Sequence, residues 1–95
     1  MEENKFEWDE NKYSSNKEKH KIDFEEAKKI FDDENRIETE DTRYDYGEKR
    51  FITIGKVLNA ILFVVYTIRE KAIRIISARR ANQNERNDYI SQLKK

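Results

Sequence analysis

The apolar residues of this chain gather in one stretch, residues 51–78, and this stretch limits where a hydrophobic core can form. It is rich in β-branched residues, which favour strands over helices. Within it, the sequence predicts strands at residues 51–54, 60–68 and 72–78, the last two joined by a short charged turn at residues 69–71. Connections this short join antiparallel neighbours. We therefore expect an antiparallel meander at the centre of the fold.

The flanking segments predict helices. A polar helix is expected after Asp9, a residue type that favours the N-cap position. Asp23 and Glu26 have the spacing of a capping box, which predicts the start of a second helix. Asn82 and Glu85 repeat that spacing near the C-terminus and predict a third helix there.

Two further segments, residues 6–8 and 36–42, have weaker strand patterns, and the second is expected at the edge of the sheet. Together the patterns predict an α+β fold, with residues 1–95 forming a single domain. Its expected architecture is a central antiparallel β-sheet of about four strands, with two N-terminal helices and a C-terminal helix.

Composition excludes several classes of protein. The chain has no cysteine and a single histidine, which rules out a disulfide scaffold, a thiolate zinc site and a multi-histidine metal site. No apolar run approaches the roughly 20 residues of a membrane-spanning helix, and the acidic N-terminal residues are unlike a signal peptide. The P-loop, dinucleotide-binding and HExxH motifs are missing. We therefore expect a cytoplasmic protein without membrane contact.

The charged residues are balanced in number and uneven in position. Residues 1–48 hold 17 acidic and 9 basic side chains, whereas residues 49–95 hold 3 acidic and 11 basic ones. Two interpretations are open: the two halves pair with each other, or the second half presents a basic surface to phosphates. Both can hold at once, because one groove can be basic while the whole molecule is neutral.

Two arginines lie in the last expected strand. Period-2 alternation places Arg74 on the same face as Ile76 and Ala78, and places Arg79 with Ser77 on the opposite face. An arginine in so apolar a strand is costly to bury unless a carboxylate or a ligand pairs with it. The alternatives are therefore a salt bridge from Arg74 to a carboxylate of the first half, or phosphate contacts by Arg74 and Arg79.

Two other places carry chemically useful groups. His20 is the only histidine, and residues 44–50 mix aromatic, acidic and basic side chains. A surface histidine and a charged turn are the ordinary interpretations. In an RNA-cleaving site His20 would act as acid or base, Tyr46 would stack on bases, and Glu48 and Arg50 would lie at a phosphate.

These groups suffice for RNA cleavage without a metal. The 2′-hydroxyl must lose a proton, the phosphorane must be stabilised, and the 5′-oxygen must gain a proton. Arginine or lysine can stabilise the phosphorane, and histidine, glutamate or tyrosine can move the protons. A site without metal or other cofactor is the simplest option, and Mg²⁺ bound by carboxylates is the alternative.

Several blocks of residues, in a fixed order, match a known family. They are FEWDENK at residues 6–12, KH at 19–20, FEEA at 24–27, DYGE at 45–48, VVYT at 64–67 and RIISAR at 74–79. The match is collinear and spans residues 6–89. With these blocks the chain resembles the BrnT family, small bacterial ribonucleases that are the toxins of type II toxin–antitoxin systems and have a RelE-like fold.

The resemblance implies a function, partners and site residues. The function would be inhibition of translation by RNA cleavage, with neutralisation by a cognate BrnA-type antitoxin. Operator DNA would be bound only through the antitoxin, in a complex that can contain a toxin dimer. The candidate catalytic residues are His20, Glu48, Arg50, Arg74 and Arg79, and the candidate RNA-binding residues are Lys19, Tyr46 and Tyr66.

The chain departs from the family pattern in two places. Lys21 stands where the family usually has glycine after the Lys-His pair, and residues 58–60 replace a turn that usually carries glycine and arginine. Glycine permits positive φ, so the first departure bears on the position of His20. It favours an alternative function, a non-catalytic binding module that pairs with an antitoxin in a DNA-binding autoregulatory complex.

Overall fold

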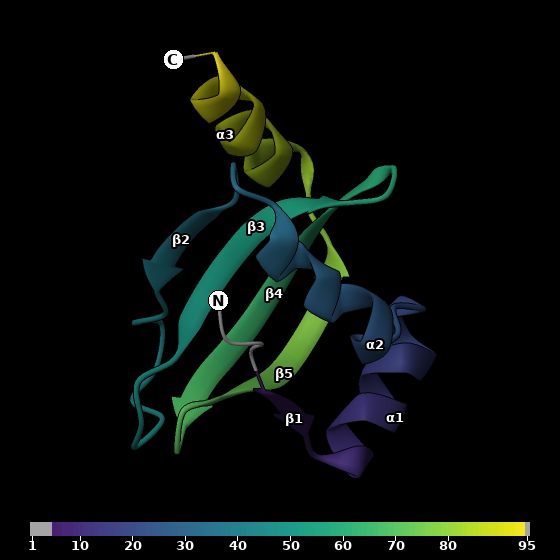
Figure 1. Cartoon of the computed structure of the whole chain (residues 1–95), viewed down its shortest axis with the longest axis vertical. Helices are drawn as coiled ribbons and strands as arrows, with labels where there is room; N and C mark the ends of the chain where they lie inside the picture. The colour runs from purple at the N-terminus through teal and green to yellow at the C-terminus, as the bar shows by residue number, and fades with distance from the viewer. Residues whose placement is uncertain (1–4, 95) are drawn as a thin grey trace.

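The structure is a computed structural model that describes residues 5–94, and it has an α+β fold built on a five-stranded sheet (Figure 1). The strand order across the sheet is β1-β5-β4-β3-β2. In chain order the elements are β1 (Lys5–Trp8), α1 (Glu10–His20), α2 (Phe24–Ala27), the 3₁₀ helix η1 (Lys28–Asp32), β2 (Ile37–Glu40), β3 (Phe51–Val57), β4 (Ala60–Arg69), β5 (Ala72–Arg80) and α3 (Gln83–Leu93).

The sheet has five strands and is mixed, which corrects the expected antiparallel sheet of about four strands. The meander β3-β4-β5 is antiparallel as predicted, and β2 pairs with β3 at one edge. At the other edge β1 runs parallel to β5, with Lys5 opposite Ala72 and Trp8 opposite Ile75. This pairing joins the first element to the last strand, so no local sequence pattern specifies it.

Helices cover one face of the sheet. Phe24, Ala27 and Ile30 are fully buried against Val64 of β4 and Ile75 of β5. In Figure 1, α2 and the turn of helix that follows it cross in front of the strands. The start of a helix predicted after Asp23 is confirmed, and the Asp23 side chain caps α2 at the backbone N–H of Glu25.

We call the opposite side of the sheet the α3 face. Its apolar residues include Ile54, Phe63 and Val65, which are each less than 10% exposed. The C-terminal helix α3 covers one end of it through Tyr89, whose hydroxyl donates a 2.6 Å hydrogen bond to Asp33. Burial, with this hydrogen bond, raises the pKa of Tyr89 to about 12. The hydroxyl therefore keeps its proton and stays a donor that anchors the helix.

A β-bulge in β5 changes which residues share a face. Val65 lies opposite Ser77, and Tyr66 lies opposite Ile75, so Ile76 is an extra residue between the two pairs. The bulge shifts the alternation by one residue. Arg74 and Arg79 therefore point to the same α3 face, and the predicted grouping of Arg74 with Ala78 is wrong.

A buried asparagine fixes α1 along the second half of β5. The amide nitrogen of Asn16 donates to the carbonyl of Ala78 at 2.8 Å, and its oxygen accepts from the N–H of Ala78 at 3.0 Å. Asn16 is only 7% exposed, and its side chain lies against the edge of β5. Because β1 pairs with β5 only as far as Ile75, Asn16 supplies the backbone hydrogen bonds that Ala78 would otherwise lack. They place His20, the last residue of α1, beside this part of the strand.

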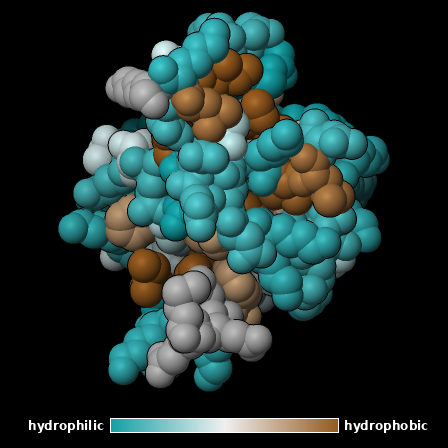
Figure 2. Space-filling view, turned by 45° about the horizontal axis from the view of Figure 1, so that its top comes forward, coloured by the Kyte–Doolittle hydropathy of each residue, from teal (hydrophilic) through white to brown (hydrophobic). Residues whose placement is uncertain are grey.

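The surface is mainly hydrophilic, with a few separate hydrophobic patches in Figure 2. Within residues 5–94 no helix is both long and apolar enough to cross a membrane.

Candidate active site on the α3 face

His20 lies in a shallow hollow between α1 and β5. The hollow has a volume of about 350 Å³, and its lining includes Lys19, Ile76 and Ser77. Burial lowers the pKa of His20 below its usual 6.5, and the positive charges of Lys19 and Arg79 lower it further. At neutral pH the imidazole is therefore uncharged, and its basic nitrogen can accept a proton.

Lys21 adopts the backbone conformation for which glycine is the usual residue. Its φ is +60° and ψ is 26°, in the left-handed region, and its N–H donates to the carbonyl of Lys17 at 2.9 Å. This is the common C-terminal cap of a helix. The departure from the family pattern therefore leaves α1 with an ordinary cap, and His20 remains at the last helical position.

Replacing Lys21 with glycine is expected to stabilise the fold. A side chain in the left-handed region costs roughly 1–2 kcal/mol, which the glycine removes. Glycine also has more conformational freedom in the unfolded chain, and this offsets about 0.4–1 kcal/mol of that gain in stability. The net gain in the free energy of unfolding should be about 0.5–1 kcal/mol, measured by urea denaturation. Glu18→Gly, in the exposed interior of α1, is the control and should lose about that much. A Lys21→Gly variant no more stable than wild type contradicts the prediction.

Arg79 lies near the C-terminal end of β5, on the α3 face. It lies opposite Phe63 in the sheet, and its guanidinium stacks on that ring, 3.9 Å from the ring centroid. Its two terminal nitrogens donate to the two carboxylate oxygens of Glu85, at 2.8 and 2.9 Å. Glu85 also completes the capping box of α3 with Asn82, as the sequence predicts. The Arg79 side chain stays 31% exposed, so a ligand can still reach it.

A second cluster of charges surrounds Glu48. Its carboxylate accepts hydrogen bonds from Arg69 at 2.8 Å and from Arg50 at 3.1 Å. The bond from Arg69, followed by the one from Arg50, holds the pKa of Glu48 below its usual value. Glu48 is therefore ionised at neutral pH and positions two cations.

This second cluster is distant from His20. Arg69 lies opposite Ala72 at the start of β5, whereas His20 lies against Ile76 and Ser77. Four to five residues of strand, about 15 Å at 3.3 Å per residue, separate the two places. His20 and Arg79 therefore share one end of the α3 face, and Glu48 and Arg50 share the other.

Arg74 forms an ion pair with Glu7 of β1, with 2.6 Å between Nη1 and Oε2. This confirms the alternative in which Arg74 pairs with a carboxylate of the first half. The pairing of Glu48 with Arg69 likewise joins the two halves, so internal complementarity accounts for part of the charge asymmetry.

The two tyrosines of the predicted site lie in different surroundings. The Tyr46 ring has the Arg50 guanidinium over it, 4.2 Å from the centroid, and its hydroxyl donates to Asp41. Tyr66 is only 4% exposed, lies on the helix-covered face and donates its hydroxyl to Glu38. Strand alternation turns Tyr66 away from Val65 and the α3 face. The structure therefore does not bring Tyr66 to the candidate site.

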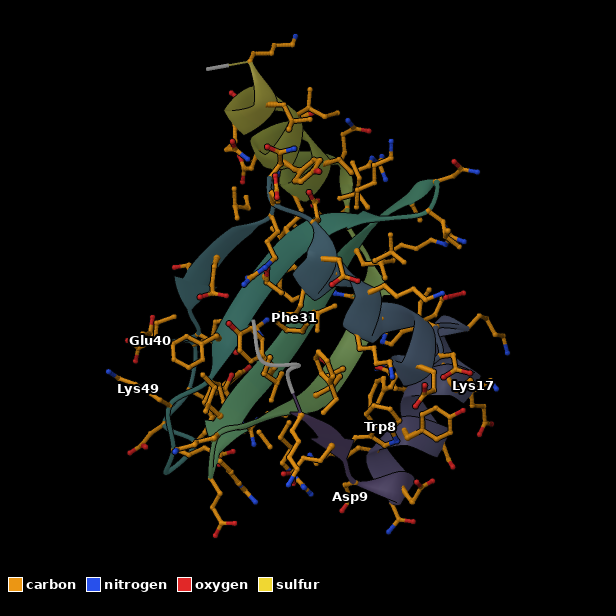
Figure 3. The ribbon with its side chains drawn as sticks, in the orientation of Figure 1. Trp8, Asp9, Lys17, Phe31, Glu40 and Lys49 are labelled. Carbon is orange, nitrogen blue, oxygen red and sulfur yellow. The ribbon has the colours of Figure 1, made fainter. Side chains whose placement is uncertain are left out.

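Arg43 also reaches the α3 face, and the sequence analysis did not name it as a site residue. It lies in the loop between β2 and β3, whose flanking residues Glu40 and Lys49 are labelled at one edge of the sheet in Figure 3. Its guanidinium reaches back over the ring of Phe63, 5.8 Å from the centroid. Asp41 and Arg43 are among the residues that match the BrnT pattern, but nothing in their spacing assigned either of them to a site.

The site offers cations and a proton acceptor. Within residues 5–94 no three histidine, aspartate or glutamate side chains gather where they could hold a metal ion. Its arginines are each paired with a carboxylate, and the neutral imidazole of His20 lies at one end. Such an arrangement can bind phosphates and accept a proton.

One comparison with known proteins identifies a family for this chain. A family described as "Ribonuclease toxin, BrnT, of type II toxin-antitoxin system" matches residues 8–85, a range that holds His20, Glu48, Arg50, Arg74 and Arg79. A search of curated proteins finds no match. The matched range covers most of the chain, and the chain therefore belongs to the BrnT family of ribonuclease toxins of type II toxin–antitoxin systems.

Proposed function

We propose that this toxin inhibits translation by cleaving RNA on its α3 face, without a metal ion. The observation that carries the proposal is that His20 lies beside Ser77 of β5, two residues before Arg79, and the charge of Arg79 helps to lower the pKa of His20. A neutral base beside a fixed cation is what cleavage at a phosphodiester requires, because one group removes a proton while the other stabilises negative charge.

Each group has a defined role in the proposed reaction. The basic nitrogen of His20 takes the proton of the 2′-hydroxyl, and that oxygen attacks the adjacent phosphorus. Arg79 stabilises the charge of the phosphorane, because its guanidinium is fixed in advance by Glu85 and by stacking on Phe63. The bond to the 5′-oxygen then breaks, that oxygen takes a proton from solvent water, and a 2′,3′-cyclic phosphate remains.

The second cluster is proposed to bind the flanking RNA. Glu48 holds Arg50 and Arg69 in place, and at about 15 Å it is too far from His20 to act on the same phosphate. Arg50 and Arg74 would contact neighbouring phosphates. Lys19, beside His20, would contact the RNA at the cleaved end, and Tyr46 would do so near Arg50.

The family also supports the proposed partners. A type II toxin has an antitoxin, and we propose that the cognate antitoxin is of the BrnA type. Operator DNA would be bound through the antitoxin, in a complex that includes a toxin dimer. The helix-covered sheet is what the proposed RelE-like fold requires.

The alternative is a binding module that pairs with an antitoxin and cleaves no RNA. One observation favours it: the arginines of the α3 face are already engaged by carboxylates, so RNA must compete with them. Growth distinguishes the two functions. A ribonuclease toxin stalls cells when it is induced without an antitoxin, and a binding module does not.

The direct test uses purified protein and naked RNA in the presence of EDTA. We expect cleavage to continue unchanged in EDTA, because every proposed step uses protein groups, and to leave 2′,3′-cyclic phosphate ends. Arg79→Ala and His20→Ala are the controls for contaminating nuclease. Cleavage that stops in EDTA and returns with Mg²⁺ contradicts the metal-independent mechanism, and equal cleavage by wild type and both variants contradicts the site.

A further inference from the structure

The loop between β2 and β3 sends one side chain back across the α3 face. Arg43 of this loop has its guanidinium over the ring of Phe63, 5.8 Å from the centroid, and Arg79 stacks on the same ring at 3.9 Å. The two guanidinium carbons are therefore no farther apart than the sum of these distances. The ring of Phe63 therefore contacts both a cation from the loop and a cation from β5.

Both guanidinium groups keep an unused edge. Arg43 donates Nε and Nη2 to Asp41, and Arg79 donates Nη1 and Nη2 to Glu85. Among the hydrogen bonds within residues 5–94, Nη1 of Arg43 and Nε of Arg79 have no acceptor. The Arg43 side chain is 54% exposed, so its free edge is open to solvent.

Asp41 fixes Arg43 in this position. The Asp41 side chain is fully buried and also accepts a hydrogen bond from the Tyr46 hydroxyl at 2.9 Å. The hydrogen bonds from Arg43 hold the pKa of Asp41 well below its usual range, so the ion pair persists at any physiological pH. A guanidinium that is already ordered loses little conformational entropy when it binds a ligand.

We propose that Arg43 and Arg79 together clamp one phosphate of the RNA, with the ring of Phe63 as the floor of the clamp. This inference rests on the proposed ribonuclease function and adds Arg43 to it as a substrate-binding residue. Planar guanidinium forks match the oxygens of a phosphodiester. Phe63 is only 7% exposed, so its ring keeps water from the side of each guanidinium that faces it and strengthens the attraction of that cation for a phosphate.

The position of Arg43 distinguishes binding from a purely structural role. Its ion pair with Asp41 already satisfies the buried carboxylate, and that pair alone does not require Arg43 to lie on the ring that carries Arg79. The loop is also anchored independently at its base, where the N–H of Asp41 donates to the carbonyl of Arg50 at 2.7 Å.

The test measures binding separately from cleavage. The probe is a short single-stranded 2′-O-methyl RNA, which has phosphates and no 2′-hydroxyl to react, and fluorescence anisotropy gives its Kd over a range of salt concentrations. We expect Arg43→Ala to weaken binding about tenfold and to lower the slope of log K against log salt by about 0.7, as loss of one phosphate contact to a single strand should.

Arg80→Ala is the matched control. Arg80 is next to Arg79 in the same strand, but it lies opposite Leu62 on the helix-covered side and is exposed. Its loss removes the same charge and should leave the slope unchanged. Because Arg43→Ala leaves Asp41 buried without its partner, the double variant Arg43→Ala with Asp41→Asn removes both charges, and it should show the same loss of binding.

Each outcome decides the inference. The clamp is overturned if the slope of log K against log salt is the same for wild type, Arg43→Ala and the double variant. It is also overturned if wild type does not bind the RNA at low salt. Loss of binding in both Arg43 variants supports it, even if wild type never cleaves RNA. A different result separates the two proposals. If wild type cleaves ordinary RNA and Arg43→Ala cleaves it equally fast and binds with the same Kd, the ribonuclease function is supported and Arg43 has no part in it.

Discussion

Replacing Arg79 with alanine should lower the rate of RNA cleavage by about 10²–10³-fold, the usual effect of removing one fixed group that stabilises transition-state charge. The guanidinium is stacked on Phe63 and held by both oxygens of Glu85, so it is ordered before the phosphorane forms. No other described cation shares that ring except Arg43. The measurement is the initial rate of RNA cleavage by purified protein, with growth arrest on induction as the cellular readout.

The controls separate loss of chemistry from loss of the fold. Glu85 is only 16% exposed, so Arg79→Ala leaves a largely buried carboxylate without its partner. The double variant Arg79→Ala with Glu85→Gln removes that charge, and thermal melting should show it to be folded while it remains inactive. Arg80→Ala should cleave at the wild-type rate. A stable Arg79→Ala protein that is fully toxic removes Arg79 from the site.

The elements that the sequence predicts correctly are those that local patterns specify. β-Branched content and a tight turn determine the β3-β4-β5 meander, and capping residues such as Asp23 and Asn82 mark the starts of α2 and α3. The parallel strand β1 is different, because Glu7 and Arg74 pair across 67 positions of sequence. Pairing at that distance depends on the assembled sheet, and a four-residue segment carries too little pattern to reveal it.

The residues of the candidate site also divide into those that a local sequence pattern indicates and those that only the folded chain brings into place. His20 and Arg79 can be selected because a lone histidine and an arginine in an apolar strand are unusual residues in their contexts. The bulge at Ile76, which turns Arg74 and Arg79 to one face, has no mark in the residue pattern. The placement of Tyr66 on the helix-covered face depends on register. Arg43 depends on the path of a loop, which the sequence does not determine.

His20 should prove to be the base of the reaction, and its replacement by alanine should lower cleavage by about 10²–10⁴-fold. The pH dependence carries the sharper prediction. Burial and the charges of Lys19 and Arg79 lower the pKa of His20, so the active neutral form predominates at and above pH 6.5. As pH falls through the lowered pKa the imidazole gains a proton, and the rate should fall tenfold per pH unit.

The same titration should change the stability of the fold in the same direction. Between the lowered pKa of the folded state and the usual value of 6.5, the unfolded chain binds more protons at His20 than the folded protein does. Stability must therefore increase with pH across this window, and His20→Ala should remove that increase. Stability that decreases across the window in wild type would show that folding raises the pKa instead.

Lys19→Ala provides a matched test of the cause. Lys19 is exposed, and its positive charge is the second cause of the lowered pKa, so removing it should move both the pKa and the acidic limb of the rate profile to higher pH. Because the chain has a single histidine, NMR titration of its ring protons reports this pKa without ambiguity. A rate profile whose acidic limb does not follow the NMR pKa in both wild type and Lys19→Ala shows that another group takes the proton.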